Sequence, residues 1–294
     1  MHNKNLIINK ELVQHLVATQ FPQWKDLLIR PVNPSGWDNR TFRIGEHMLV
    51  RMPTAEEYAA QVAKEHLWLP KLAPLLSLTI PTPLALGQLT DTYPWNWSIY
   101  NWLKGESATS ANITNLSDFA FSLAQFLISL HHIDTTDGPL PGPHNFYRGG
   151  TLMTYDAETR QAIAALEDKI DTNAATRIWK AALATSWHQS PVWVHGDISV
   201  GNLLVQDGKL SSVIDFGMLA VGDPACDLVI TWTLFKGESR KQFKKALPYD
   251  DGTWDRARAW ALWKALIVAA GFSGTNATES TQSLLTLDEI LSEQ

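Results

Sequence analysis

One cysteine, Cys226, is present in the 294-residue sequence, which excludes an intrachain disulfide and a cysteine-rich metal site. Long apolar runs are also lacking. The longest, ALWKALIVAAGF (261–272), is too short to span a bilayer and contains Lys264. The opening stretch MHNKNLIINKELVQHL has no apolar core of the kind found in secretory signal peptides. These absences predict a cytoplasmic protein with no membrane partner.

An excess of positive charge is missing as well. Asp and Glu number 30 against 24 Lys and Arg, a net charge of −6, which disfavours nonspecific binding to nucleic acid or to anionic lipid. The same charge suits a cationic ligand, but solubility alone would account for it. Hydrophobic residues make up 45% of the chain and charged residues 18%, which is typical of a folded globular protein.

The N-terminal part predicts short strands. Residues 10–20 have the pattern of an amphipathic helix, and residues 29–52 indicate two or three strands with turns at NPSGW and GEH. A further strand is predicted at WSIYNWL (97–103), and Gly105 with the polar run after it indicates a boundary. We therefore expect a small β-rich lobe over residues 1–104.

Beyond this boundary, long periodic segments predict helices, at 115–132, 156–187 and 254–270. One short strand-rich island, 192–216, interrupts them. The larger part, 105–294, is therefore expected to be mainly helical. The whole chain is expected to have an α+β fold with two lobes.

A hairpin is predicted in the strand-rich island, because Asp207-Gly208 is a two-residue turn signal between two apolar runs. With this turn, the paired strands would bring Asn202 and Asp215 together at the open end of the hairpin. Asp197 lies just before the same end.

These three side chains supply the carboxylate and amide oxygens that Mg²⁺ prefers, with its remaining ligands taken from water and phosphate. Each of them alone is more typical of a turn residue bonded to its own backbone. Together, an aspartate and an asparagine in one loop, followed by Asp-Phe-Gly at 215–217, form the phosphoryl-transfer signature of kinase-like folds. The pattern predicts a magnesium site in the segment of Asp197, to which the hairpin contributes Asn202 and Asp215 as ligands.

A kinase site also needs a basic residue on a strand to hold the phosphates and a helix glutamate to hold that base. Thr54 and Glu57 form a capping-box pattern, which predicts a helix starting near Ala55. Glu65 falls on the apolar face of this helix, and a buried carboxylate requires a partner. Arg51, at the end of the preceding strand, is the nearest candidate. The alternative is a Glu65 whose head group reaches solvent.

The loop NPSGWDN (33–39) is predicted to cover the phosphates, with Gly36 and Asn39 as candidate nucleotide-binding residues. It has one glycine where a G-x-G-x-x-G loop has three, so by itself it indicates an ordinary turn. Arginine at position 51 replaces the lysine that is usual in protein kinases, which keeps the charge but changes the geometry. No GxxxxGK[ST] motif occurs in the chain.

Three motifs, HGDISVGN (195–202), IDFG (214–217) and GDPACDL (222–228), resemble the aminoglycoside phosphotransferase family, which includes macrolide kinases and is similar to choline-kinase-like enzymes. The family patterns HGDxxxxN and GDPxxD are fully matched. The resemblance continues through SGWDN and NWLKGE along the length of the chain. It implies a bilobal, protein-kinase-like fold and Mg²⁺-dependent transfer of the γ-phosphate of ATP or GTP to a hydroxyl of a small molecule.

By this resemblance, Asp197 accepts or orients the proton of the acceptor hydroxyl, and Arg51, held by Glu65, contacts the α- and β-phosphates. His195 orients the catalytic loop by hydrogen bonding, and Asp227 braces it. The resemblance also implies a hinge whose backbone reads the purine, formed by Asn101, Trp102 and Leu103.

The acceptor cleft is expected in the helical C-terminal part. Acidic side chains there would favour an amino-sugar antibiotic, and apolar or aromatic walls a macrolide or another bulky ligand. Three segments that carry acids, aromatics or both do not decide between these, namely 134–138, 145–150 and 249–260. We predict an aminoglycoside-type acceptor, with a macrolide or a metabolic alcohol or sugar as the alternative. A pseudokinase that only binds nucleotide is a third hypothesis, against which the intact catalytic motifs argue.

Overall fold

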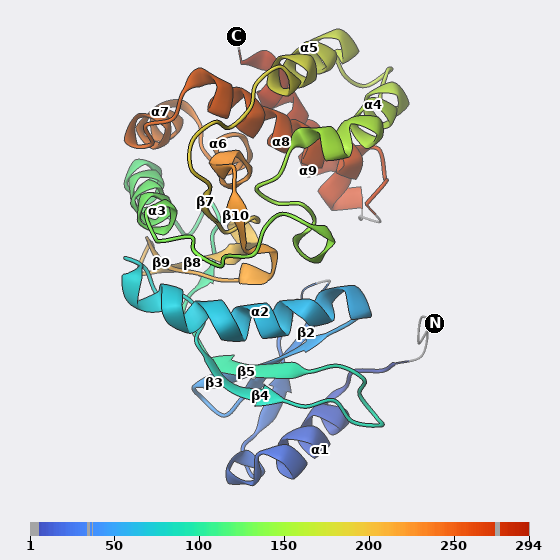
Figure 1. The fold of residues 1–294 in the computed structure, drawn as a ribbon, viewed down its shortest axis with the longest axis vertical. Coiled ribbons are helices and arrows are strands. Elements are labelled where there is room, and N and C mark those ends of the chain that lie inside the picture. The colour runs from blue at the N-terminus through green and yellow to red at the C-terminus, as the bar shows by residue number, and fades with distance from the viewer. Residues whose placement is uncertain (1–5, 34–35, 37, 274–276, 294) are drawn as a thin grey trace. The chain divides into compact units, whose positions relative to one another are not determined.

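The computed structural model describes residues 6–33, 36, 38–273 and 277–293, and these form two compact units (Figure 1). Within them, the first unit comprises the residues up to Gly105 together with Ser211–Gly217, and the second comprises Glu106–Leu210 and the residues from Met218 onward. The predicted lobes were 1–104 and 105–294, so the prediction placed the segment Ser211–Gly217 in the second lobe, whereas it clusters with the first unit. This segment is tied to the first unit by backbone pairing, since the Val213 amide donates to the Thr79 carbonyl at 3.1 Å.

The first unit is built on an antiparallel five-stranded sheet with the order β1-β2-β3-β5-β4 (Figure 1). The strands are β1 Ile29–Pro31, β2 Asn39–Ile44, β3 Met48–Pro53, β4 Pro83–Gly87 and β5 Trp97–Asn101. The predicted strand 97–103 therefore ends two residues early. The sequence did not predict β4, because Pro83 at its start and Pro81 just before it argue against a strand.

Two helices flank this sheet, α1 Lys10–Gln20 and α2 Glu56–Leu72. Val50 and Met52 of β3 join α1 in the apolar core. Alternation along a strand turns the residue between them, Arg51, to the opposite face of the sheet, where α2 contacts β3 and β5. The fold of this unit thus directs the Arg51 side chain toward α2.

The start of α2 differs in detail from the prediction. The helix begins at Glu56, and Ala55 occupies the N-cap position without a side-chain capping bond. The hydroxyl of Thr54 donates instead to the Asp38 carbonyl at 3.1 Å. The predicted helix is confirmed, but the capping box by which it was located is wrong.

The second unit is mainly helical, as predicted, with two small sheets of order β10-β7 and β6-β8-β9. Its helices are α3 Leu116–His131, α4 Asp156–Ala165, α5 Thr172–Leu183, α6 Ile230–Thr233, α7 Gly237–Ala246, α8 Asp251–Ala269 and α9 Ala277–Ser292. Its strands are β6 Glu106–Ser107, β7 Val192–Val194, β8 Leu203–Gln206, β9 Lys209–Val213 and β10 Ala220–Gly222, of which β9 continues into the first unit. The periodic segment 156–187 forms two helices because Asp171 caps a new one, accepting from the Ala174 amide.

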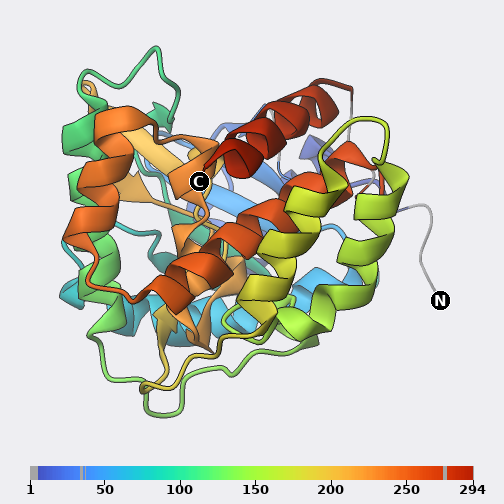
Figure 2. The same ribbon diagram turned by 90° about the horizontal axis from the view of Figure 1, so that it is seen from above.

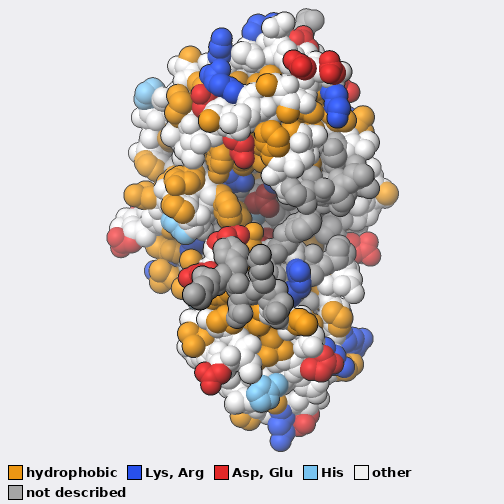
Figure 3. Space-filling view, turned by 90° about the vertical axis from the view of Figure 1, so that its right-hand side faces the viewer, with side chains coloured by type: hydrophobic (Ala, Val, Ile, Leu, Met, Phe, Trp, Pro, Cys, Tyr) orange, Lys and Arg blue, Asp and Glu red, His pale blue; other side chains and the backbone are white. Residues whose placement is uncertain are grey.

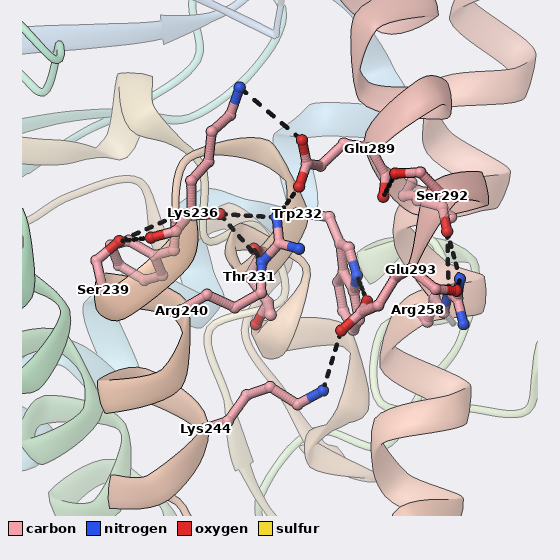
Figure 4. A network of polar contacts seen from close by, with 12 residues as sticks. Thr231, Trp232, Lys236, Ser239, Arg240, Lys244, Arg258, Glu289, Ser292 and Glu293 are labelled. Carbon is pink, nitrogen blue, oxygen red and sulfur yellow. Dashed lines mark hydrogen bonds and ion pairs between the residues drawn. The ribbon is translucent and has the colours of Figure 1, made fainter.

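Helix α8 is central to this unit, with α5 and α9 packed beside it (Figure 2). Carboxylates at and just after the end of α9 bind cations of α7, and backbone carbonyls there bind a cation of α8 (Figure 4). Glu289 pairs with Arg240 at 2.6 Å, and Glu293 with Lys244 at 3.4 Å. The guanidinium of Arg258 on α8 donates to the Ile290 carbonyl at 3.1 Å. These bonds anchor α9 on the scaffold that carries α8.

None of the described helices has both the length and the apolar character needed to cross a membrane. On the face drawn in Figure 3, the described acidic and basic side chains are interspersed. This distribution agrees with the modest net charge of the chain.

Candidate functional site

Arg51 lies at the centre of a charged cluster in the first unit. Its Nη1 contacts both carboxylate oxygens of Glu65, at 3.1 and 3.3 Å. Its Nη2 contacts Oδ1 of Asp215 at 2.7 Å. Glu65 is 3% exposed, so the predicted ion pair is confirmed and the alternative of a solvent-reaching Glu65 is wrong. The second partner, Asp215, was not predicted.

The electrostatics of this cluster stabilise a permanent cation. Burial opposes the charge of Arg51, but the carboxylates of Asp215 and Glu65 outweigh it and hold the pKa of the guanidinium well above its ordinary value. Asp38 is the third acid of the cluster. Burial and the nearby charge of Asp215 raise its pKa. Glu65 also accepts from the phenol of Tyr100, whose pKa is raised by burial and by Glu65.

The Asp-Phe-Gly segment (215–217) is fixed by the conformation or the contacts of each of its three residues. Asp215 has a left-handed backbone, with φ of 68°, a conformation in which aspartate is one of the tolerated residues. The ring of Phe216 is fully buried. Lys64 of α2 donates to the Gly217 carbonyl at 2.6 Å, and burial lowers the pKa of this lysine to about 8. Nothing in the sequence singles out Lys64, because lysine is common on helix surfaces.

The loop predicted to cover the phosphates is described only in part, since Pro34, Ser35 and Trp37 lie outside the described residues. The carbonyl of Gly36 accepts from Arg40 at 2.9 Å. Asn39 is buried at the start of β2 and is paired with Pro53 of β3.

The predicted hinge residues follow one another at the end of β5. Asn101 exchanges bonds with Thr82, its amide donating to the Thr82 carbonyl at 3.1 Å and its side-chain oxygen accepting from the Thr82 amide at 2.5 Å. The amide of Trp102 donates to the His47 carbonyl at 2.7 Å. Within the described part of the chain, the Leu103 amide makes no hydrogen bond.

The HGDISVGN loop (195–202) in the second unit is organised around Asp227. This fully buried carboxylate accepts from the amides of His195 and Gly196, both at 2.7 Å. Glycine is required at 196 because its φ is 84° and a Cβ would lie 2.6 Å from the Met218 carbonyl oxygen. The ring Nδ1 of His195 accepts from the Asp197 amide at 3.2 Å. The bracing by Asp227 and the orienting bond of His195 are thus present as predicted.

The rest of the GDPxxD motif secures the same loop region. At Gly222, a Cβ would lie 2.1 Å from the Gly149 carbonyl oxygen, so only glycine allows this approach. Asp223 accepts from the Ala225 amide at 3.0 Å and pairs with the buried Arg256 of α8 at 2.6 Å. The motif therefore connects the loop to α8.

The carboxylate of Asp197 has a donor on each oxygen. Asn202 Nδ2 donates to Oδ2 at 2.9 Å, and Lys264 Nζ of α8 donates to Oδ1 at 2.8 Å. Burial opposes ionisation of Asp197, but Lys264, followed by Arg148 and His195, outweighs it and lowers the pKa to about 2. The Asp197 side chain remains 30% exposed. It is therefore an ionised and oriented carboxylate with access to a ligand.

A hollow in the second unit opens beside Asp197. Its lining residues are Arg148, Gly196, Asp197, Cys226, Val229, Trp260, Trp263 and Lys264. The Arg148 guanidinium lies over the rings of Trp260 and Trp263, at 5.2 and 5.1 Å from their centroids. Two of the three segments considered for the acceptor thus contribute, but through Arg148 and Trp260, neither of which is an acid.

The predicted hairpin is confirmed at its turn. Asp207 and Gly208 have φ of 52° and 75°, as a type I′ turn requires, and they join adjacent strands. The pairing does not extend to Asn202, which ends the 3₁₀ turn Val200–Asn202. Asn202 belongs to the second unit and Asp215 to the first. Their joint role as metal ligands stays a prediction.

Comparison with known proteins agrees with this arrangement. Residues 29–260 match the model of the phosphotransferase enzyme family. A curated aminoglycoside 3'-phosphotransferase of Escherichia coli is 26% identical over 186 residues, which cover 61% of this chain and 64% of the relative, so the match spans less than two thirds of the relative's length.

Solved structures show the same fold. The GDP and kanamycin complex of APH(2")-IIia matches with a TM-score of 0.73 and 18% identity, over 96% of this chain and 98% of that one. The macrolide 2'-phosphotransferase MphH from Brachybacterium faecium matches with a TM-score of 0.60 and 19% identity, over 95% of this chain and 98% of that one. The bilobal α+β kinase-like fold predicted from the sequence is thereby confirmed. Because the matched residues include both the Arg51 strand and the Asp197 loop, this chain belongs to the phosphotransferase enzyme family.

Proposed function

We propose that this phosphotransferase moves the γ-phosphoryl group of ATP or GTP to a hydroxyl of a small-molecule antibiotic of the aminoglycoside type. The observation that carries the proposal is the setting of Asp197. A loop braced by the buried Asp227 presents this carboxylate, with a hydrogen-bond donor on each oxygen. The carboxylate lies at a hollow that is lined by large side chains. The curated relative is an aminoglycoside 3'-phosphotransferase, which supports this acceptor class.

In the proposed reaction, the acceptor hydroxyl oxygen forms a bond to the γ-phosphorus. The bond from that phosphorus to its bridging oxygen breaks, and the nucleoside diphosphate leaves with the electron pair. The hydroxyl proton passes to Asp197. A carboxylate whose pKa is about 2 is a weak base, so its main contribution is to orient the hydroxyl and to take the proton late in the transfer.

On the donor side, Arg51 binds the α- and β-phosphates, with Glu65 and Asp215 holding its guanidinium, while Gly36 and Asn39 belong to the covering loop. We assign the Leu103 backbone amide as the group that donates a hydrogen bond to the purine. This assignment is supported by the bonds that the Asn101 and Trp102 amides already make to other backbone carbonyls.

The residues proposed as Mg²⁺ ligands have suitable oxygens. Asn202 directs its Nδ2 to Asp197, which leaves its amide oxygen for a cation. Asp215 uses Oδ1 for Arg51 and retains Oδ2. No group of three or more His, Cys, Asp and Glu side chains within the described ranges forms a metal cluster, so the other ligands would be phosphate and water oxygens. When bound, the ion would neutralise phosphate charge.

A macrolide is the second candidate acceptor. The walls provided by Trp260, Trp263 and Val229 favour a bulky apolar ligand, and one solved structure of the same fold is a macrolide 2'-phosphotransferase.

The test is mass spectrometry of reaction mixtures containing Mg²⁺, ATP or GTP, and a panel of aminoglycosides, macrolides and metabolic alcohols. We expect a phosphate adduct on an aminoglycoside. An adduct only on a macrolide would select the second candidate, and nucleotide binding without any adduct would contradict the proposal in favour of a pseudokinase.

We further expect the enzyme to work in the cytoplasm, where nucleoside triphosphates are supplied. Activity confined to another compartment on cell fractionation would refute that.

A further inference from the structure

Lys264 lies in an unusual place for an ordinary helix lysine. It is the charged residue within the apolar run of α8, and it lines the hollow beside Asp197 together with Trp260 and Trp263, four and one residues before it in the chain. Its side chain is 49% exposed. The helix thus presents a half-exposed cation at the proposed reaction centre.

The contact of Lys264 complements that of Asn202. The Lys264 ammonium donates to Oδ1 of Asp197 at 2.8 Å, and Asn202 donates to Oδ2 at 2.9 Å. Because these donors come from separate segments of the chain, rotation of the carboxylate would break at least one bond. Asn202 fixes one oxygen from within the loop, and Lys264 fixes the other from α8.

Stability does not account for this pair. A half-exposed ion pair contributes little to folding, since solvent screens it and the long lysine side chain loses entropy. The charge has a different consequence at this site. An ionised Asp197 repels an approaching anionic phosphoryl group, and an ammonium in contact with the carboxylate offsets that repulsion.

We propose that Lys264 is a positioning residue for phosphoryl transfer, which holds Asp197 toward the acceptor hydroxyl and neutralises it against the incoming phosphoryl group. This inference rests on the proposed function. The proton, the forming bond and the breaking bond are those given above, and Lys264 neither gains nor loses a proton in the step. Arg148, the other cation of the hollow, is bound to the Gly196 carbonyl at 2.9 Å and does not replace it.

The experiment compares Lys264→Met and Lys264→Arg with the wild-type enzyme. We expect Lys264→Met to lower kcat about 100-fold, the scale on which misplacement of a reacting group acts, with a nucleotide KM within about threefold of wild type because nucleotide binding is assigned to the first unit. Arginine keeps the charge and should restore kcat to within about tenfold. The control is Lys245→Met, an exposed lysine of α7, which should leave kcat unchanged.

The readouts are acceptor-dependent transfer and phosphate release to water in the absence of acceptor, at matched thermal stability. Wild-type activity with a Lys264→Met variant of equal kcat would overturn the role of Lys264 and leave the proposed function standing. A wild-type enzyme inactive in both assays would overturn the proposed function itself. Loss of kcat that arginine does not relieve would show that the charge is not what matters, and would also overturn the inference.

Discussion

The Arg51 cluster (Arg51, Asp38, Glu65 and Asp215) and the Asp197 cluster (Asp197, Asn202, Arg148 and Lys264) are built with opposite charge balance. In the first, one guanidinium faces three carboxylates, and in the second, one carboxylate faces two cations. An excess of carboxylates suits a site that must bind a divalent cation together with phosphate. An excess of cations suits a site where a carboxylate must stay ionised beside an incoming anion. We therefore expect each cluster to be completed by a charge that the substrate complex brings.

The largest effect is expected from Asp197→Ala. Removing the carboxylate that orients the hydroxyl should lower the transfer rate about 1,000-fold. Nucleotide affinity, assigned to the Arg51 cluster, should stay within about threefold. Steady-state kinetics and calorimetric titration with nucleotide measure the two. Asp168→Ala, an exposed aspartate of the same unit, is the control. Transfer at the wild-type rate would remove Asp197 from catalysis.

Asp215→Ala tests the other cluster. If Asp215 is a metal ligand, the affinity for nucleotide in the presence of Mg²⁺ should fall by at least about 100-fold. Even the loss of a residue that only hydrogen-bonds to a metal ligand lowers metal affinity by about 10–100-fold. Arg51 keeps Glu65 as a partner, so the variant should still fold. Nucleotide affinity is measured along a magnesium titration. An unchanged titration would place the metal elsewhere and remove the charge argument for this cluster.

Glu65→Gln separates stability from metal binding within the Arg51 cluster. Breaking a buried ion pair costs about 3–5 kcal/mol when a charge is left alone. Here Asp215 still pairs with Arg51, so we expect a smaller loss, about 2 kcal/mol in the free energy of unfolding. Urea unfolding measures it, with the exposed Glu56→Gln on the same helix as control. A loss no larger than that of the control would mean that Glu65 does not contribute through its charge.

The smallest effect concerns Lys64 and pH. Burial lowers its pKa to about 8 from 10.5, so between these values the unfolded chain binds more protons than the folded one. Stability should therefore rise with pH in this window, by on the order of 1 kcal/mol between pH 8 and 9.5 relative to Lys64→Met. Urea unfolding at both pH values gives the difference, and the exposed Lys104→Met is the control. An identical pH dependence of wild type and Lys64→Met would show that Lys64 is not desolvated.

The turn of the hairpin and the ion pair of the Arg51 cluster were predictable because the signal for each is local. Asp207-Gly208 specifies its turn through the positive φ that both residues adopt. Glu65 was found because an acid on an apolar helix face requires a partner, and Arg51 was its nearest candidate. The hairpin ladder was overextended because pairing was counted from the turn alone, whereas the chain leaves the strand before Asn202 to form a 3₁₀ turn.

The sequence by itself determined the predicted chemistry of this protein, since the HGDxxxxN, DFG and GDPxxD motifs indicate a kinase-like catalytic loop and its brace within short segments. Only the tertiary structure decided which charged and polar groups meet across long separations in the chain. Lys64 and Lys264 are unremarkable in their helices, yet one binds Gly217 and the other Asp197. The physical reason is that helix packing, not spacing along the chain, sets which partner each buried or half-buried charge finds.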